Sequence, residues 1–155
     1  MRSVVLSIII QFVPVTLVHG HADSPQELAD TYKELHDKRD IDQIIALYYS
    51  KDAASSSVST INYGLKTEFE DNQKIKEIVI NKIDPGELEK IASGIPYGDE
   101  LLIVPTLDKV THTMTVVVET EGPYPATIEQ EIHMGKTESG YLLSMQKFKR
   151  PNEAK

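Results

Sequence analysis

The stretch from Thr111 to Thr120, T-H-T-M-T-V-V-V-E-T, decides the fold of this chain. It is rich in β-branched residues, which suit the pleated surface of a sheet and lose rotamer freedom in a helix. Alternate side chains of a strand point to opposite faces. One face here carries His112, Met114, Val116 and Val118. We therefore predict a strand with one buried face.

Similar patterns lie on both sides of this stretch. A Gly/Pro cluster at residues 121–125 interrupts the alternation. Residues 126–134 then alternate again, with an inward face made of Ile128, Gln130, Ile132 and Met134. Residues 100–106 and 141–148 are the other predicted strands, with a turn at 135–140. Short loops between alternating strands indicate an antiparallel meander with one buried face.

The segment before this sheet is predicted to be mostly helical. Ser24 and Pro25 favour a helix start, and the apolar stripe that follows includes Tyr32. Asp40 caps a second helix that is expected to end near Tyr49. A third helix is expected from about residue 60 to residue 71, because Ile61, Leu65 and Phe69 recur every four residues. Residues 74–83 fit a helix or a strand, and their β-branched content favours a strand.

The N-terminal 22 residues have the features of a secretory signal peptide. Arg2 is followed by an apolar run at residues 4–18 and by small residues at Gly20 and Ala22. The run of about 15 residues is shorter than the roughly 20 needed to cross a bilayer, which argues against a membrane anchor. We expect a secreted or periplasmic protein with no membrane contact after cleavage of residues 1–22.

Cleavage after Gly20 would make His21 the mature N-terminus. Its amine and imidazole are able to chelate copper, provided that His112 or His133 completes the site. Cleavage after Ala22 removes this histidine. The pattern is too incomplete to predict a metal or a cofactor, and we predict none.

Length and composition limit the number of domains, the kinds of partner and the kinds of site that the chain can have. The 155 residues suit one domain, which we place at residues 23–150 and follow with a flexible tail at 151–155. The net charge of −8 argues against a nucleic-acid partner. The chain has no cysteine, so it has neither a disulfide nor a thiolate metal site. No G-x-S-x-G, glycine-rich phosphate loop or zinc-spaced histidine pair occurs, and we predict no catalytic residue.

The order of these elements resembles the NTF2-like superfamily. A helical hairpin at residues 24–49, a further helix and then a curved antiparallel sheet of four or five strands carry the resemblance. It implies an α+β fold, a cone in which the sheet wraps around the N-terminal helices and leaves a cavity at its open end. Relatives of this kind include ketosteroid isomerase and SnoaL-like cyclases. Some members catalyse reactions in the cavity, and others bind ligands or dimerise through the sheet.

A ligand pocket is therefore the expected site. Its candidate residues come from the inward strand face and from the helices: His112, Gln130, Ser144, Tyr32, Tyr48 and Tyr49. A few polar groups among apolar ones are typical of a small-ligand site. The alternative for His112 is a solvated strand end, and for Gln130 a bond to backbone or water. The outward residues, Thr127, Glu129, Glu131 and His133, are either solvated or part of an interface.

The expected function is non-enzymatic binding of a small hydrophobic ligand or a partner protein, with a homodimer as one form of partnership. The alternative is an isomerase-like or SnoaL-like enzyme that acts on a hydrophobic small molecule, with His112 or a tyrosine as its acid or base. Such an enzyme needs a carboxylate base in an apolar pocket, with hydrogen-bond donors nearby. The inward strand positions carry no Asp or Glu. For this reason no catalytic residue is carried over from the resemblance.

Overall fold

The computed structural model of the chain describes residues 22–98, 100–121 and 125–151. Residues 1–21 of the signal segment predicted at 1–22 and residues 152–155 of the tail predicted at 151–155 lie outside these residues. Ala22 is the first described residue, and its carbonyl accepts a 2.8 Å hydrogen bond from the backbone N–H of Tyr141. No described helix is both long enough and apolar enough to span a membrane.

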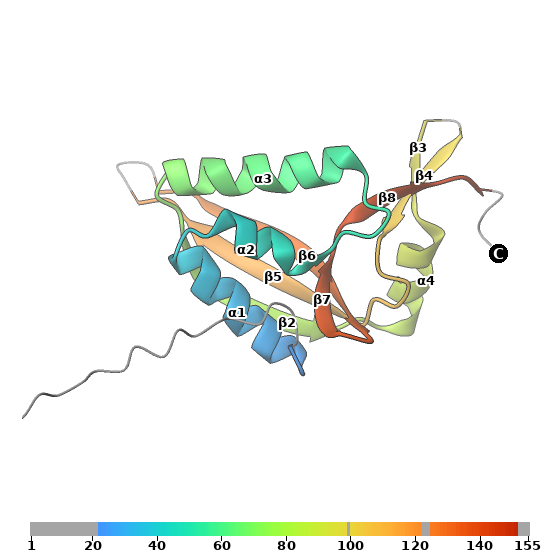
Figure 1. The fold of residues 1–155 in the computed structure, drawn as a ribbon, viewed down its shortest axis with the longest axis horizontal. Coiled ribbons are helices and arrows are strands. Elements are labelled where there is room, and N and C mark those ends of the chain that lie inside the picture. Colours follow the sequence, from blue (N-terminus) through green and yellow to red (C-terminus); the bar gives the residue numbers. More distant parts are fainter. Residues whose placement is uncertain (1–21, 99, 122–124, 152–155) are drawn as a thin grey trace, which may run out of the picture.

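The described chain is an α+β fold, as predicted, but its strands form two sheets (Figure 1). The main sheet has the strand order β1-β7-β6-β5-β2, and the small sheet has the order β3-β4-β8. Helices α1 to α3 lie along one side of the main sheet, and α4 lies beside the small sheet. The helices are α1 Pro25–Asp37, α2 Ile41–Ala46, α3 Ser55–Glu70 and α4 Pro85–Ser93. The strands are β1 Tyr48–Tyr49, β2 Lys74–Lys82, β3 Ile95–Tyr97, β4 Leu101–Pro105, β5 His112–Glu119, β6 Thr127–Thr137, β7 Gly140–Ser144 and β8 Gln146–Lys149.

Side chains at the predicted caps start the helices. Ser24 accepts a hydrogen bond from the N–H of Glu27, with Pro25 in the first turn of α1. Asp40 caps α2 in the same way through the N–H of Gln43. Capping satisfies N–H groups that have no partner inside the helix, which is why short helices such as α2 begin where they do.

The register of β5 against β6 confirms the predicted inward face. His112, Met114, Val116 and Val118 lie opposite Met134, Ile132, Gln130 and Ile128, respectively. Met114, Val116, Val118 and Met134 are fully or almost fully buried in the core against α1 and α2. Ile128 was expected in this core, but it is 42% exposed. Residues 74–82 are a strand, β2, which pairs with β5 from Lys74 to Lys82 with a register shift between Ile75 and Glu77.

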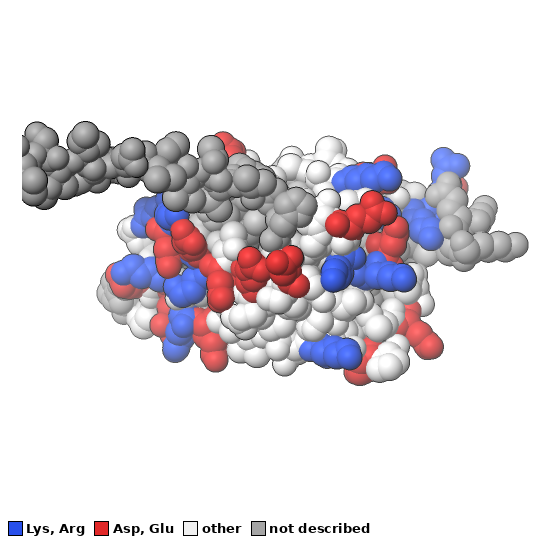
Figure 2. Space-filling view, turned by 60° about the horizontal axis from the view of Figure 1, so that its bottom comes forward, with Lys and Arg blue, Asp and Glu red and all other residues white. Residues whose placement is uncertain are grey.

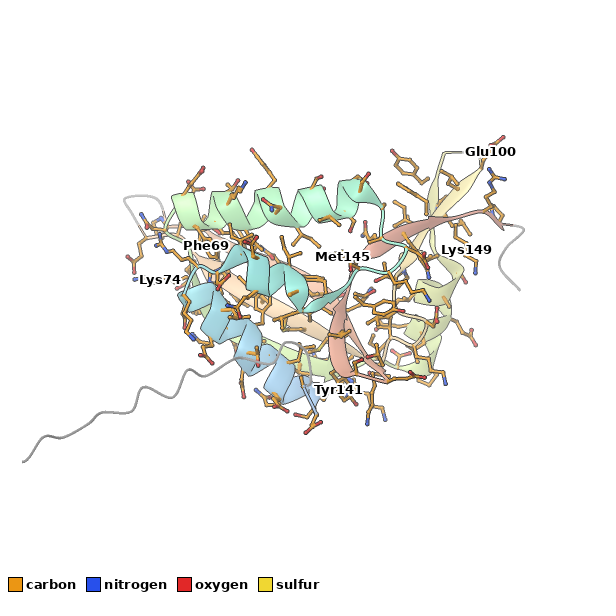
Figure 3. All side chains as sticks on the ribbon, in the orientation of Figure 1. Phe69, Lys74, Glu100, Tyr141, Met145 and Lys149 are labelled. Carbon is orange, nitrogen blue, oxygen red and sulfur yellow. The ribbon has the colours of Figure 1, made fainter. Side chains whose placement is uncertain are left out.

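Three predicted boundaries are wrong. The second helix ends at Ala46, and Tyr48 and Tyr49 instead form β1, which pairs in parallel with β7. The third helix begins at Ser55 and not near residue 60. The predicted last strand at 141–148 is divided between β7 and β8, which belong to different sheets. Met145 stands at the division (Figure 3), and its buried side chain joins the core there.

The departure of β8 from the main sheet leaves part of β6 without a neighbour. β7 pairs with β6 only at residues 134–137. In the described chain, residues 127–133 of β6 pair only with β5. The N–H of Thr120 bonds to the carbonyl of Ala126, so by alternation the backbone groups of Thr127, Glu129 and Glu131 point away from β5. We call residues 127–133 the open edge of β6.

Acidic and basic side chains are interspersed on the face shown in Figure 2. Several form exposed ion pairs, among them Lys33–Asp37 and Lys74–Glu121. Such pairs contribute at most about 1 kcal/mol each because water screens them. The stability of the fold therefore rests on the core and on the buried hydrogen bonds.

One buried hydroxyl joins the two sheets. Thr106 Oγ1 donates to the carbonyl of Tyr49 at 2.6 Å and accepts from the N–H of Met145 at 3.0 Å. The backbone N–H of Thr106 donates to the carbonyl of Met145 at 2.9 Å. Thr106 thereby connects β1 in the main sheet to the junction of β7 and β8, directly after β4 in the small sheet.

We predict that Thr106→Val lowers the free energy of unfolding by about 1–3 kcal/mol, because it removes the partner of a partly buried carbonyl and of a buried N–H. Urea unfolding followed by circular dichroism measures the change. Thr31→Val is the control. Its hydroxyl bonds to the carbonyl of Glu27 in an exposed position, and we expect a change below about 0.5 kcal/mol. Equal effects of the two substitutions would contradict the role assigned to Thr106.

Candidate functional site

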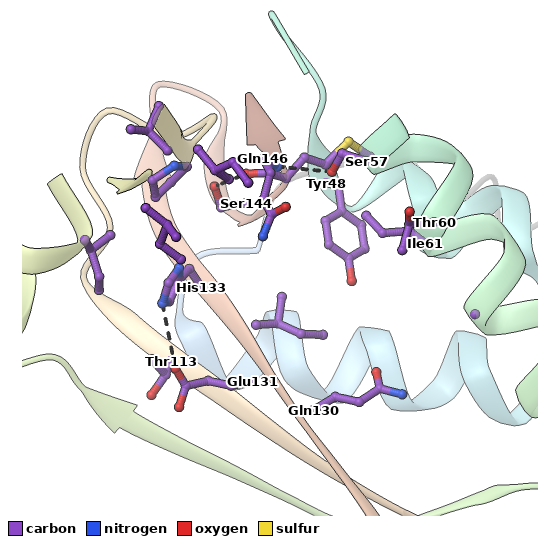
Figure 4. A pocket seen from close by; sticks show the side chains of 18 of the residues that line it. Tyr48, Ser57, Thr60, Ile61, Thr113, Gln130, Glu131, His133, Ser144 and Gln146 are labelled. Atoms are coloured by element: carbon purple, nitrogen blue, oxygen red, sulfur yellow. Dashed lines mark hydrogen bonds and ion pairs between the residues drawn. The ribbon is translucent and has the colours of Figure 1, made fainter. Parts of the chain in front are cut away.

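A cavity of about 800 Å³ lies between α3, the open edge of β6 and the small sheet (Figure 4). This volume is within the range of small-molecule sites. Its walls come from both sheets and from α1, α3 and α4. The lining includes Tyr32, Tyr48, Ser56, Ser57, Thr60, Ile61, Gly64, Leu65, Glu68, Glu87, Lys90, Ile91, Ile95, Ile103, Val104, Pro105, Thr113, Gln130, Glu131, Ile132, His133, Ser144, Met145 and Gln146.

A buried carboxylate, that of Glu68 on α3, lies in the inner part of this cavity. Glu68 is only 6% exposed. One of its oxygens lies 3.1 Å from Nε2 of His36, a buried residue of α1, and the other accepts a hydrogen bond from the side-chain amide of Gln130 on β6. The ring of Phe69 packs edge-on against His36 at 4.9 Å between centroids. The carboxylate is thus held in one orientation by groups from a second helix and from the sheet.

Two buried tyrosines share the inner part with Glu68. Tyr32 and Tyr48 are both buried, and within the described residues neither hydroxyl has a hydrogen-bond partner. Figure 4 shows the hydroxyl of Tyr48 pointing into the cavity. Burial raises the pKa of Tyr48 well above its usual value, and the nearby charge of Glu68 adds to the shift. Burial also raises the pKa of Tyr32, with further contributions from Tyr48 and Glu68.

Both hydroxyls therefore keep their protons at neutral pH and are able to donate hydrogen bonds. Neither hydroxyl oxygen is among the enclosed, unsatisfied polar atoms of the described chain, so both remain accessible from the cavity that they line. An oxygen atom of a molecule in the cavity would provide the missing acceptor. The inner part of the site thus combines apolar walls with two donors and a fixed carboxylate.

The outer part of the cavity extends past the open edge of β6 toward α4. Thr113, Glu131 and His133 line it, and alternation places them on the face opposite to Gln130. Nε2 of His133 lies 3.8 Å from a carboxylate oxygen of Glu131. Burial lowers the pKa of His133, while the carboxylates of Glu131 and Glu87 act in the opposite direction.

In the part of the chain that the structure describes, no cluster of three His, Cys, Asp or Glu side chains is arranged to hold a metal ion. His21, on which the copper hypothesis depends, lies outside the described residues. The structure therefore adds no support to that hypothesis.

The structure brings four of the six predicted pocket residues to the cavity: Tyr32, Tyr48, Gln130 and Ser144. The hydroxyl of Ser144 bonds to backbone groups, with its oxygen 3.3 Å from the N–H of Leu107. Its hydroxyl therefore mainly stabilises the cavity wall and is less available to bind a ligand.

The other two predicted residues, His112 and Tyr49, lie outside the lining. Nδ1 of His112 bonds to the hydroxyl of Thr111 at 2.9 Å, and its ring meets that of Tyr141 at 6.1 Å. Tyr49 packs against a separate small core. It points away from Tyr48 because consecutive residues of a strand face opposite sides.

Strand alternation does not indicate Glu68 and His36 because both lie on helices, Glu68 on α3 and His36 on α1. The helical spacing of the sequence does indicate that Glu68 is buried. Glu68 follows Ile61 by seven residues and Leu65 by three, so it lies on the apolar stripe of α3. A charged residue on such a stripe is buried and needs a partner, and the histidine on the buried stripe of α1 provides it.

No protein-family model and no curated protein matches the chain.

We predict that His133 makes stability depend on pH. Because its pKa is lower in the folded state, the unfolded chain binds a proton more readily, and stability falls as pH decreases. The contribution of the neutral imidazole is complete above about pH 6.5, the ordinary pKa of histidine, and is lost below it. Urea unfolding at pH 7.5 and pH 5 should show that the free energy of unfolding decreases less for His133→Gln than for the unchanged chain.

Glu131→Gln is the matched control for this measurement. It removes a carboxylate that opposes the shift, so we expect a larger loss of stability between pH 7.5 and pH 5. If the unchanged chain and the two variants lose the same free energy of unfolding between pH 7.5 and pH 5, His133 is not the source of the pH dependence.

Proposed function

We propose that this chain is an exported NTF2-like domain that binds a small, mostly apolar molecule with a neutral polar end. The predicted signal peptide supports export. The order of helices and strands and the cavity between α3 and the sheet support the likeness to that superfamily. The observation that carries the proposal is a pair of tyrosine hydroxyls, those of Tyr32 and Tyr48, which line the cavity beside the carboxylate of Glu68 and have no hydrogen-bond partner among the described residues.

The chemistry of the inner cavity indicates the kind of polar end. Tyr32 and Tyr48 donate to an oxygen, and Glu68 accepts from a hydroxyl. The inner lining has no lysine or arginine, since Lys90 belongs to the outer part with α4. An alcohol or a ketone oxygen is therefore a better match than a carboxylate, which would lie close to Glu68 without a cation of its own.

We predict that Tyr48→Phe weakens binding of 1-hexanol by about threefold to tenfold, the usual range for one neutral hydrogen bond. Displacement of the neutral dye Nile red, followed by its fluorescence, measures the affinity. Tyr63→Phe is the control, because Tyr63 is 74% exposed on α3 and does not line the cavity. If 1-hexanol does not displace the dye, or if both variants behave alike, the proposal is wrong.

A second function, proton transfer at a carbon next to a carbonyl, is favoured by the same groups. Glu68 is a carboxylate in a largely apolar cavity, and Tyr48 is a donor that stays protonated. In this mechanism Glu68 removes the proton, the C–H electron pair forms an enolate, and a tyrosine hydroxyl donates to the enolate oxygen. Return of the proton to the same carbon completes an exchange. With a β,γ-unsaturated ketone, delivery of the proton to the γ-carbon of the dienolate completes an isomerisation.

Exchange of the α-protons of cyclohexanone in D2O tests this second function. If it operates, the protein accelerates the exchange seen by NMR, and Glu68→Gln reduces the acceleration by at least about a hundredfold, as loss of a general base does. Glu70→Gln on the exposed side of α3 should leave the rate unchanged. An unaccelerated exchange in the presence of bound cyclohexanone would leave binding as the sole function of the site.

A further inference from the structure

The small sheet carries an exposed apolar surface that no described part of the chain covers. Ile95 is 65% exposed, Tyr97 56% and Phe148 43%. Phe148 lies opposite Ile103, and Ile103 lies opposite Ile95. The rings of Tyr97 and Phe148 meet with their centroids 5.1 Å apart. These four residues therefore share one face of the sheet, which we call the apolar strip.

The apolar strip continues the wall of the cavity. Ile103 and Ile95 line the cavity, and Phe148 and Tyr97 extend the same face beyond it. Apolar side chains thus extend from the cavity lining at Ile103 and Ile95 to the outside of the molecule at Phe148 and Tyr97. The polar groups that lack partners lie at one end of this path, and large exposed apolar side chains lie at the other.

We infer that the natural ligand is an elongated neutral amphiphile, and this inference rests on the proposed function. Its hydroxyl or carbonyl end binds at Tyr48, Tyr32 and Glu68. Its hydrocarbon chain leaves the cavity along Ile103 and Ile95 and covers Phe148 and Tyr97. Each methylene laid on the strip removes apolar surface from water, which strengthens binding about threefold to fourfold.

The absence of tryptophan from the sequence gives a direct test. Tyr97→Trp places a single indole on the strip, and Tyr63→Trp places one on an exposed site of α3 outside the lining. We expect 12-bromododecan-1-ol to quench the fluorescence of the Tyr97→Trp protein but not that of the Tyr63→Trp protein. The shorter 4-bromobutan-1-ol should displace Nile red without quenching either indole, because its chain ends inside the cavity.

The affinities of alcohols of different length give an independent test of whether the hydrocarbon chain contacts the apolar strip. Tyr97→Ser should weaken the binding of 1-dodecanol by about tenfold and change the affinity for 1-hexanol by less than about twofold. Tyr63→Ser should change neither. Dodecanoate should bind more weakly than 1-dodecanol, because the inner cavity repels a carboxylate. Tighter binding of dodecanoate would reverse the assigned orientation and overturn the inference.

The outcomes separate this inference from the proposed function. In one outcome, 1-hexanol binds and Tyr48→Phe weakens this binding, but 12-bromododecan-1-ol does not quench the fluorescence of the Tyr97→Trp protein. The cavity then binds ligand, and the path along the strip is wrong. If no alcohol displaces Nile red, both proposals fail. If Tyr97→Ser converts a dimer to a monomer in sedimentation and leaves alcohol binding unchanged, the strip contacts a second copy, and the inference is overturned.

Discussion

The hydroxyl of Thr106 is the contact on which the arrangement of the two sheets depends. It holds the carbonyl of Tyr49 and the N–H of Met145 at the same point. A strand that continued straight from β7 would pair with the rest of β6 and close the sheet. The bonds to Thr106 instead fix the place where the chain turns into β8 and joins β4. The space left beside β6 becomes the cavity.

The same contact orients the groups that face this space. Tyr48 directly precedes the residue whose carbonyl Thr106 holds, so the direction of β1 sets the direction of the Tyr48 side chain. Glu68 reaches the cavity from the opposite side, on a helix that the His36 and Gln130 contacts tie to α1 and β6. Burial of a carboxylate is expensive unless hydrogen bonds satisfy it. The polar site is therefore built by elements that pack independently and meet only in the folded chain.

The sequence was sufficient for the features that depend on local periodicity. The inward face of β5 and β6, the strand at residues 74–82 and the caps at Ser24 and Asp40 follow from alternation and capping chemistry. The two-residue strand at Tyr48 is too short to have a period, and its sequence continues the apolar pattern of the preceding helix. The division of the last strand at Met145 depends on Thr106, which is distant in sequence. Glu68 was accessible from helical spacing, but its partners His36 and Gln130 are defined only by how α1 and the sheet pack.

The open edge of β6 has a consequence for how the protein behaves among copies of itself. An unpaired strand edge is a template for another strand, and edge-to-edge pairing leads to aggregation. Along this edge the side chains of Glu129 and Glu131 are exposed on the outward face. Pairing of two copies would bring these carboxylates together, and like charges on paired strands are unfavourable. The acidic pattern on the outward face thus disfavours pairing of this edge between two copies of the chain.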